Sequence, residues 1–275
     1  MTQSPFAAVQ RPWFKDLCDY YNVPSDIALA LGTRSTGRRP NLPPSPTTHA
    51  VSGKTFEDIW ALSPRDSQEE VFKFYKDQGA WSSFRQVVRH MTMRDFHLTV
   101  LQQVLNPGST YCEYGCGVAP FTHSLLETVD QKTQINICLS DVDCEHFTFG
   151  VWRARRVIAE RNLENVSLEV RTVLPNELPV YTSPLDTVLI FEVLEHVPSP
   201  VSTIRNLTNQ IKTGGLLCEN FISHPQDDND ADGPDLKSAA RERNAYYEML
   251  EQEYTLAAGK PVKEFPNDTR VWRKK

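Results

Sequence analysis

The stretch YCEYGCGVA, residues 111–119, limits the fold of this chain more than any other segment. A short apolar run leads to an acid, Glu113, and then to Gly115 and Gly117. Pro120 opens a helix-like segment, which suits proline because its missing N–H would have no helical partner there. Glycine permits positive φ and close approach of the backbone to a ligand. The stretch therefore predicts a strand that turns into a helix N-terminus, an arrangement that binds nucleotide-like ligands.

The downstream sequence alternates between strand-like and helix-like segments. In the segment 202–212, Ile204, Leu207 and Ile211 lie three and four positions apart, on one helical face. Alternation of this kind predicts parallel βαβ units with right-handed crossovers. The apolar runs that we interpret as further strands are 135–139, 166–173, 185–193 and 216–222, and a second helix is expected over 145–161.

Four features in this order resemble the class I S-adenosylmethionine-dependent methyltransferases. EYGCGVA is similar to the first motif of that family, with Ala119 where many members have a third glycine. Asp141 falls where the family carries the acid that binds the ribose hydroxyls. IFEVLEHV, residues 190–197, resembles the fourth motif, and KTGGLL, residues 212–217, resembles the turn before the fifth strand.

The resemblance implies a Rossmann-like α/β fold, a mostly parallel seven-stranded sheet with helices on both faces. It also implies S-adenosyl-L-methionine as cofactor. The methionine end would contact Glu113, Gly115 and Gly117, and the ribose would contact Asp141. Phe191 is expected near the methionine or the methyl acceptor.

The resemblance spans residues 108–224, so the rest of the chain needs a separate interpretation. We expect residues 1–106 to form an N-terminal helical cap or strap, with a Pro-rich linker near 32–54. Residues 107–275 would form the cofactor-binding methyltransferase domain, with a lid insertion near 225–258. Helices are expected over 6–21, 26–31, from Ser63 to about Gly79, 83–105 and 236–258, and an antiparallel last strand over 269–275.

Composition limits the cellular compartment and the classes of binding partner that we expect. No N-terminal apolar segment resembles a signal peptide, and no run approaches the ~18 residues of a membrane span. The six cysteines show no paired spacing typical of zinc, which favours a reducing cytoplasm. A net charge of −6 argues against a broad nucleic-acid surface. We expect a cytoplasmic protein with no membrane or nucleic-acid partner. The sequence does not decide the oligomeric state, and a homodimer is one alternative.

The catalytic candidates follow the fourth and fifth strands, because ligands bind at the carboxyl ends of strands in open α/β sheets. They are Glu192, His196 and His224. Histidine titrates near neutral pH, so His196 is the preferred residue to activate the nucleophile or hold the acceptor.

A metal-assisted alternative rests on the spacing E-x-x-E-H. Glu192, Glu195 and His196, with His224 as an added ligand, would suit Mg²⁺, Mn²⁺ or Zn²⁺. The spacing resembles the metal-binding signature of small-RNA 3′-end 2′-O-methyltransferases and of some O-methyltransferases of quinone biosynthesis. L-E-H-V also follows the fourth strand in members of the superfamily that use no metal, so the interpretation without metal is preferred.

These observations favour a methyltransferase acting on oxygen or nitrogen of a small-molecule acceptor, including acceptors of secondary metabolism. One alternative is a metal-assisted RNA 2′-O-methyltransferase. Another is a methyltransferase-like module that binds the cofactor or a partner without transferring the methyl group. The acceptor itself is not encoded in any motif of the sequence.

Overall fold

The computed structural model describes residues 12–33, 60, 63–222, 235–262 and 267–275. Within these ranges a seven-stranded sheet has the order β3-β2-β1-β4-β5-β7-β6. The first five strands are parallel, and β7 runs antiparallel to both β5 and β6. The expected mostly parallel sheet is confirmed. Its strands are β1 Thr110–Tyr114, β2 Ile135–Val142, β3 Val166–Val173, β4 Leu185–Phe191, β5 Ile211–Asn220, β6 Tyr254–Ala258 and β7 Arg270–Lys274.

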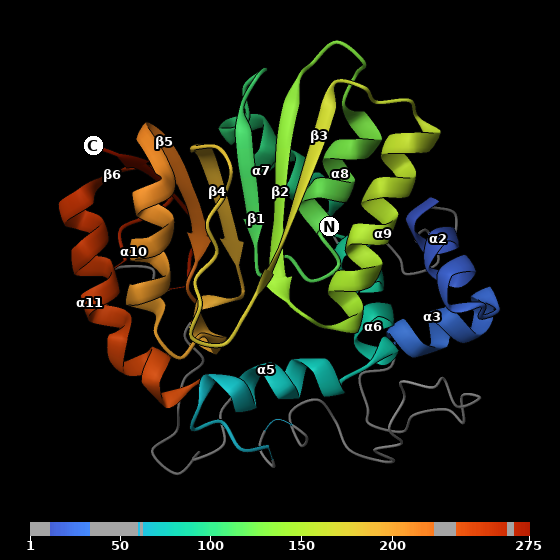
Figure 1. Ribbon diagram of the computed structural model, residues 1–275, viewed down its shortest axis with the longest axis horizontal. Helices are drawn as coiled ribbons and strands as arrows, with labels where there is room; N and C mark the ends of the chain where they lie inside the picture. The colour runs from blue at the N-terminus through green and yellow to red at the C-terminus, as the bar shows by residue number, and fades with distance from the viewer. Residues whose placement is uncertain (1–11, 34–59, 61–62, 223–234, 263–266) are drawn as a thin grey trace.

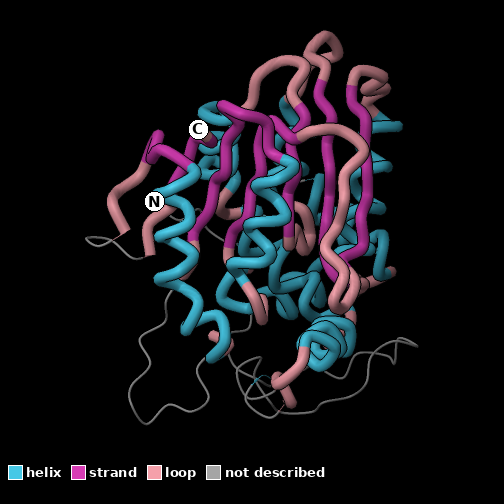
Figure 2. The backbone as a smooth tube through the Cα atoms, turned by 60° about the vertical axis from the view of Figure 1, so that its left-hand side comes forward, coloured by secondary structure: helices cyan, strands magenta, loops and turns pink. Residues whose placement is uncertain are grey.

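Helices cover both faces of this sheet (Figures 1 and 2). One layer contains α7 Arg94–Val104, α8 Pro120–Thr128 and α9 Glu145–Glu160, which pack on one another in that order. The other contains α10 Pro200–Gln210 and α11 Lys237–Glu253. The middle strands are apolar and buried on both sides, as Val188, Leu189 and Ile190 of β4 show, which a sheet covered by helices on both faces requires.

The N-terminal helices pack against this core in two places. Three of them, α2 Pro12–Tyr21, α3 Ser25–Thr33 and α6 Ala80–Met91, share a second apolar cluster with Phe149 of α9. Helix α5, Gln68–Asp77, instead crosses the end of the sheet at which the parallel strands finish (Figure 1). Its Val71 and Phe74 belong to the main core. Helix α5 therefore lies next to the carboxyl ends of the strands, whereas α2 and α3 pack on α6, and α2 also packs on α9.

The sequence-based element boundaries were wrong at several places. The fifth strand, expected over 216–222 after a turn at 212–217, runs over Ile211–Asn220 and includes that segment. The helix expected from Ser63 begins at Gln68, because Ser67 and Glu70 form a capping box. The helix expected over 83–105 is two helices, which separate at Thr92 and Met93 so that α6 packs on α3 and α7 on α8. The helix expected over 236–258 ends at Glu253, because residues 254–258 pair with β7 as an edge strand.

Part of the expected cap and lid lies outside the described residues. This applies to residues 34–54 of the Pro-rich linker and to residues 225–234 of the lid. The remainder of the lid segment is largely α11, which packs on α10 and on β6.

Candidate active site

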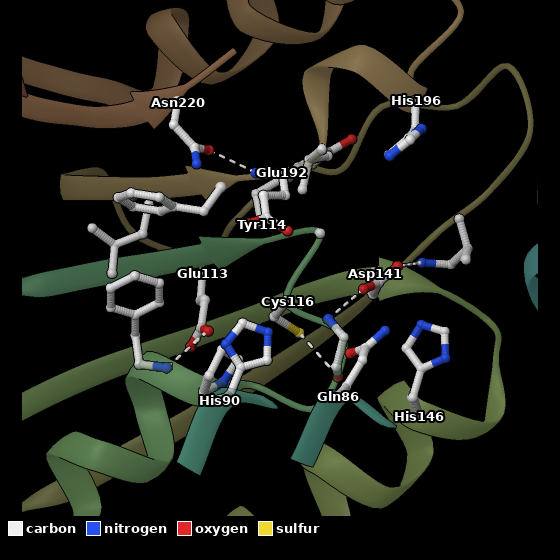
Figure 3. A pocket seen from close by; sticks show the side chains of 18 of the residues that line it. Gln86, His90, Glu113, Tyr114, Cys116, Asp141, His146, Glu192, His196 and Asn220 are labelled. Atoms are coloured by element: carbon white, nitrogen blue, oxygen red, sulfur yellow. Dashed lines mark hydrogen bonds between the residues drawn. The ribbon is translucent and has the colours of Figure 1, made fainter. Parts of the chain in front are cut away.

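A cavity of about 380 Å³ opens where β1, β2, β4 and β5 end, beneath α5, α6 and α7 (Figure 3). Seven of the residues singled out in the sequence line it, namely Glu113, Gly115, Gly117, Asp141, Phe191, Glu192 and His196. His224 lies outside the described residues. Glu195 is buried but is not among the lining residues. The strand ends therefore bring together most of the expected site.

The glycine turn packs closely against neighbouring side chains. Gly115 has φ +64°, and a Cβ on it would lie 2.4 Å from Cγ2 of Val193. Gly117 has φ +51°, and a Cβ on it would lie 2.5 Å from Oε1 of Gln86. The Gly115 amide donates a 2.7 Å hydrogen bond to the Ser140 carbonyl, which fixes the turn against β2. Both positions thus favour glycine for their backbone conformation, and Gly115 also requires it for space beside Val193.

Asp141 stands at the end of β2 with both carboxylate oxygens oriented by backbone amides. The Gly117 N–H donates to Oδ2 at 2.6 Å, and the N–H of Val142 donates to Oδ1 at 2.7 Å. Burial raises the pKa of Asp141 to about 6, although these two hydrogen bonds act to lower it. The group is therefore mainly ionised at pH 7, and each oxygen retains a lone pair for a ligand hydroxyl.

Glu113 is oriented toward the first turn of α8. Its carboxylate accepts hydrogen bonds from the N–H of Phe121 at 3.1 Å and from the N–H of Thr122 at 2.9 Å. The Thr122 hydroxyl donates a third bond at 2.7 Å. Burial raises the pKa of Glu113 to about 7. The residue thus holds α8 against β1, because a carboxylate is favourable at a helix N-terminus.

Glu192 adopts an unusual backbone conformation at the end of β4. Its φ is +54°, in a region that is uncommon for residues other than glycine. Its N–H donates to Oδ1 of Asn220 at 2.7 Å, and its Oε1 lies 2.5 Å from Nη2 of Arg89 on α6. The conformation is thus supported by β5 on one side and by the cap on the other. Strained backbone of this kind is typical of functional sites.

The three residues of the E-x-x-E-H spacing do not lie together in the cavity. His196, in the 3-10 turn Leu194–His196 that follows β4, lines the cavity, and its ring centroid lies 5.3 Å from that of Trp60. The Glu195 side chain is buried and does not line the cavity. Its backbone carbonyl accepts a 2.9 Å hydrogen bond from the N–H of Leu236, the residue before α11. Burial raises the pKa of Glu195 to about 8. Among the described residues, no group of three His, Cys, Asp or Glu side chains is placed to hold a metal ion.

Several cavity residues were not identified from the sequence. Gln86, Arg89, His90 and Met93 line the cavity from α6 and its C-terminal end. Their spacing of i, i+3, i+4 and i+7 places them on one helical face, and this face interrupts the apolar pattern of the segment with polar groups. The spacing was therefore a usable signal for a site. His97 on α7 and His146 on α9 complete this set.

His146 belongs to a hydrogen-bonded group beside the glycine turn. Its Nδ1 lies 3.0 Å from the Ser82 hydroxyl of α6, and its Nε2 lies 3.2 Å from the Cys144 thiol. Burial lowers the pKa of His146 to about 4, so the ring is neutral at pH 7. The group fixes α6 against the start of α9.

Comparison with known proteins identifies the class and then the family. The sheet order and the cavity at the strand ends define a Rossmann-like methyltransferase fold. A family model described as "Methyltransferase domain" matches residues 105–262. The chain belongs to this family and is an S-adenosylmethionine-dependent methyltransferase. No curated protein gives a significant match.

Three solved structures with a similar fold are distant from this chain in sequence. The small RNA methyltransferase HEN1 is 14% identical, with a TM-score of 0.51 over 66% of this chain and 25% of that chain. A methyltransferase described as SAM dependent, from Aquifex aeolicus, is 18% identical, with a TM-score of 0.45 over 64% and 88%. The N-methyltransferase NodS from Bradyrhizobium japonicum WM9 is 16% identical, with a TM-score of 0.45 over 66% and 95%. At these identities the likeness is one of fold.

None of the helices in the described residues is both long enough and apolar enough to cross a bilayer.

Proposed function

We propose that this methyltransferase transfers the methyl group of S-adenosyl-L-methionine to an oxygen or nitrogen of a small-molecule acceptor. The observation that carries this proposal is the roofed cavity. Residues of α5, α6 and α7 line it on the side away from the strands, and Met93, Phe96, Phe121 and Phe191 are part of its lining. A concave, largely apolar site with a few polar groups is typical of small-molecule binding. The residues before β1 would accordingly act as a cap over the acceptor.

The residues at the strand ends fit the cofactor. Gly115 and Gly117 line the cavity, and their positive φ allows the tight turn that follows β1. Asp141 offers two oriented oxygens for the ribose hydroxyls, and Phe191 and Glu113 border the same space. When bound, S-adenosylmethionine supplies a methyl group that its sulfonium makes electrophilic. The protein would contribute by positioning the acceptor and by accepting its proton.

The RNA alternative receives less support from this site. The Arg89 guanidinium at the cavity is paired with Glu192, and the chain carries a net charge of −6. A metal-assisted mechanism would use Glu195, which does not line the cavity. The name of HEN1, a small RNA methyltransferase, nevertheless makes RNA the acceptor class to test beside small molecules.

Methyl transfer from labelled cofactor would test the proposal. The protein is incubated with S-[methyl-¹⁴C]adenosylmethionine and either a metabolite extract or total RNA, each with and without EDTA. We expect label in the small-molecule fraction, and we expect EDTA to leave its amount unchanged. Label confined to RNA, or lost with EDTA and restored by Mg²⁺, would instead support the metal-assisted RNA enzyme. Tight cofactor binding without transfer would indicate a binding module.

On the acceptor side we assign Glu192 and His196 to holding the acceptor. With the acceptor found in this assay, His196→Ala is expected to raise KM about three- to tenfold, the effect of one lost hydrogen bond. The kcat and the affinity for cofactor are expected to change less. A fall in kcat of ~10²–10⁴ at unchanged KM would make His196 the general base and contradict the holding role.

A further inference from the structure

Two histidines of the cap lie next to each other at the aromatic end of the cavity. His90 of α6 and His97 of α7 both line the cavity, and their ring centroids lie 5.5 Å apart. His97 is 1% exposed. Neither was identified from the sequence, and neither belongs to the group formed by Glu192 and His196 after β4. Figure 3 labels His90 and His196 in different parts of the cavity lining.

Hydrogen bonding on α8 fixes the tautomer of His97. The Ser124 hydroxyl donates its only proton to the Pro120 carbonyl at 2.9 Å. The same hydroxyl oxygen lies 3.2 Å from Nδ1 of His97. Because the hydroxyl proton is already used, Nδ1 must carry the hydrogen and donate it to Ser124. Nε2 of His97 is therefore the nitrogen with the free lone pair.

That lone pair is enclosed and has no partner among the residues that the structure describes. Nε2 of His97 is buried without a hydrogen bond there, and so is Nδ1 of His90. Burial lowers the pKa of His97 to about 4 and holds that of His90 well below its usual range. Both rings are thus neutral at pH 7. Buried polar atoms without a partner are costly and rare in folded proteins, so the position of Nε2 of His97 at a cavity indicates that a ligand supplies the donor.

The surroundings of His97 are aromatic. The ring of Phe121 lies 4.7 Å from His97 and 4.8 Å from Phe191, centroid to centroid, and the two phenylalanine rings are inclined by only 33°. Phe96 lies 6.1 Å from each of these phenylalanines, which it meets edge-on. Aromatic rings prefer offset-stacked and edge-to-face neighbours. A flat aromatic ligand would be accommodated here with its polar group toward the imidazole.

We propose that His97 is the catalytic base and that the acceptor is an aromatic molecule with a hydroxyl or amine group. This rests on the proposed function. Nε2 of His97 accepts a hydrogen bond from the acceptor O–H or N–H. As the acceptor atom forms its bond to the methyl carbon, the carbon–sulfur bond breaks with its electron pair left on sulfur, and the acceptor proton moves to Nε2. His97 keeps its bond to Ser124, a positioning residue, and later releases the proton to solvent.

The tautomer and the hydrogen bond can be measured by NMR. The full chain is labelled with ¹⁵N-histidine and loaded with S-adenosylhomocysteine, whose binding is measured first by calorimetry. 2-Naphthol is then compared with 2-methoxynaphthalene, which has the same rings but no donor. We expect His97, assigned by the loss of its signals in His97→Phe, to be the Nδ1–H tautomer at pH 7. We expect 2-naphthol, and not the methyl ether, to shift its Nε2 resonance.

Three variants separate a specific role from a structural one. His97→Phe is expected to weaken 2-naphthol binding about three- to tenfold without changing that of the ether, and to lower kcat by ~10²–10⁴ with the identified acceptor. Ser124→Ala is expected to populate the second tautomer of His97. His123→Phe is the matched control, because His123 is buried on α8 but does not line the cavity.

Two results would overturn the assignment: an Nε2–H tautomer of His97 in the wild-type protein, or equal responses of Nε2 to the two naphthalenes. These outcomes differ from failure of the proposed function. If S-adenosylhomocysteine does not bind, the proposed function fails. If it binds and 2-naphthol leaves His97 unchanged, only the role of His97 fails.

Discussion

Asp141→Ala is expected to weaken the binding of S-adenosylmethionine by about 1–3 kcal/mol, because ribose hydroxyls would lose their acceptor in a buried site. The carboxylate is already oriented by the amides of Gly117 and Val142, at 2.6 and 2.7 Å. Isothermal titration would measure the change. Asp143→Ala is the matched control, since Asp143 lies two residues away and pairs with Lys76 at the surface. Equal affinities of the wild type and a folded Asp141→Ala variant would contradict the ribose assignment.

The same residue predicts how cofactor binding depends on pH. Burial places the pKa of Asp141 near 6 in the free protein, and the ionised form is the better acceptor of hydroxyl hydrogen bonds. Affinity should therefore be constant above about pH 7 and fall as the pH drops through 6. The pKa of Glu113, about 7, also lies in this range. Asp141→Asn should remove only the part of the pH dependence that is due to Asp141. An unchanged pH profile of this variant would contradict the role given to Asp141.

The sheet was predictable because its signals are local. Gly115 and Gly117 mark the turn after β1, and the run 188–191 is apolar without a break, as expected of a strand covered on both faces. Motifs at successive strand ends converge in space whenever the strands are parallel. For this reason Gly115, Gly117, Asp141, Phe191 and Glu192 line one cavity.

The cavity residues that the N-terminal helices supply were less predictable, because their positions depend on packing between distant segments. Arg89 reaches Glu192 across 103 positions of sequence, and nothing local to α6 specifies that partner. His97 acquires its tautomer only from Ser124 on α8. The E-x-x-E-H spacing also misled in part, since it does not reveal that the turn Leu194–His196 directs Glu195 toward α11.

The edge strand β6 shows the same limit in secondary structure. Residues 254–258 continue a helical pattern, so the sequence favours a longer α11. The structure pairs them with β7, and the Tyr254 hydroxyl donates to that of Thr208 at 2.8 Å. Tertiary pairing thus outweighs local helix propensity, which is a weak preference of a few tenths of a kcal/mol per residue.

The buried ion pair between α2 and α9 predicts the largest loss of stability. Nε of Arg153 lies 2.9 Å from Oδ2 of Asp16, and its Nη2 lies 3.2 Å from Oε1 of Glu127. The Arg153 side chain is fully buried. Asp16→Ala is expected to lower the free energy of unfolding by about 3–5 kcal/mol, because it leaves a buried charge with incomplete pairing. Urea denaturation would measure this change.

The pair itself is not expected to be a net source of stability. Burial raises the pKa of Asp16 and lowers that of Arg153, so for each group desolvation outweighs the attraction of its partner. Replacing both by apolar residues, Asp16→Leu with Arg153→Met, should therefore cost less than Asp16→Ala alone. Asp19→Ala is the exposed control, with a much smaller expected change, because solvent screens its ion pair with Lys15. A double variant less stable than Asp16→Ala would contradict this expectation. It would show that the attraction between Asp16 and Arg153 exceeds the cost of burying them.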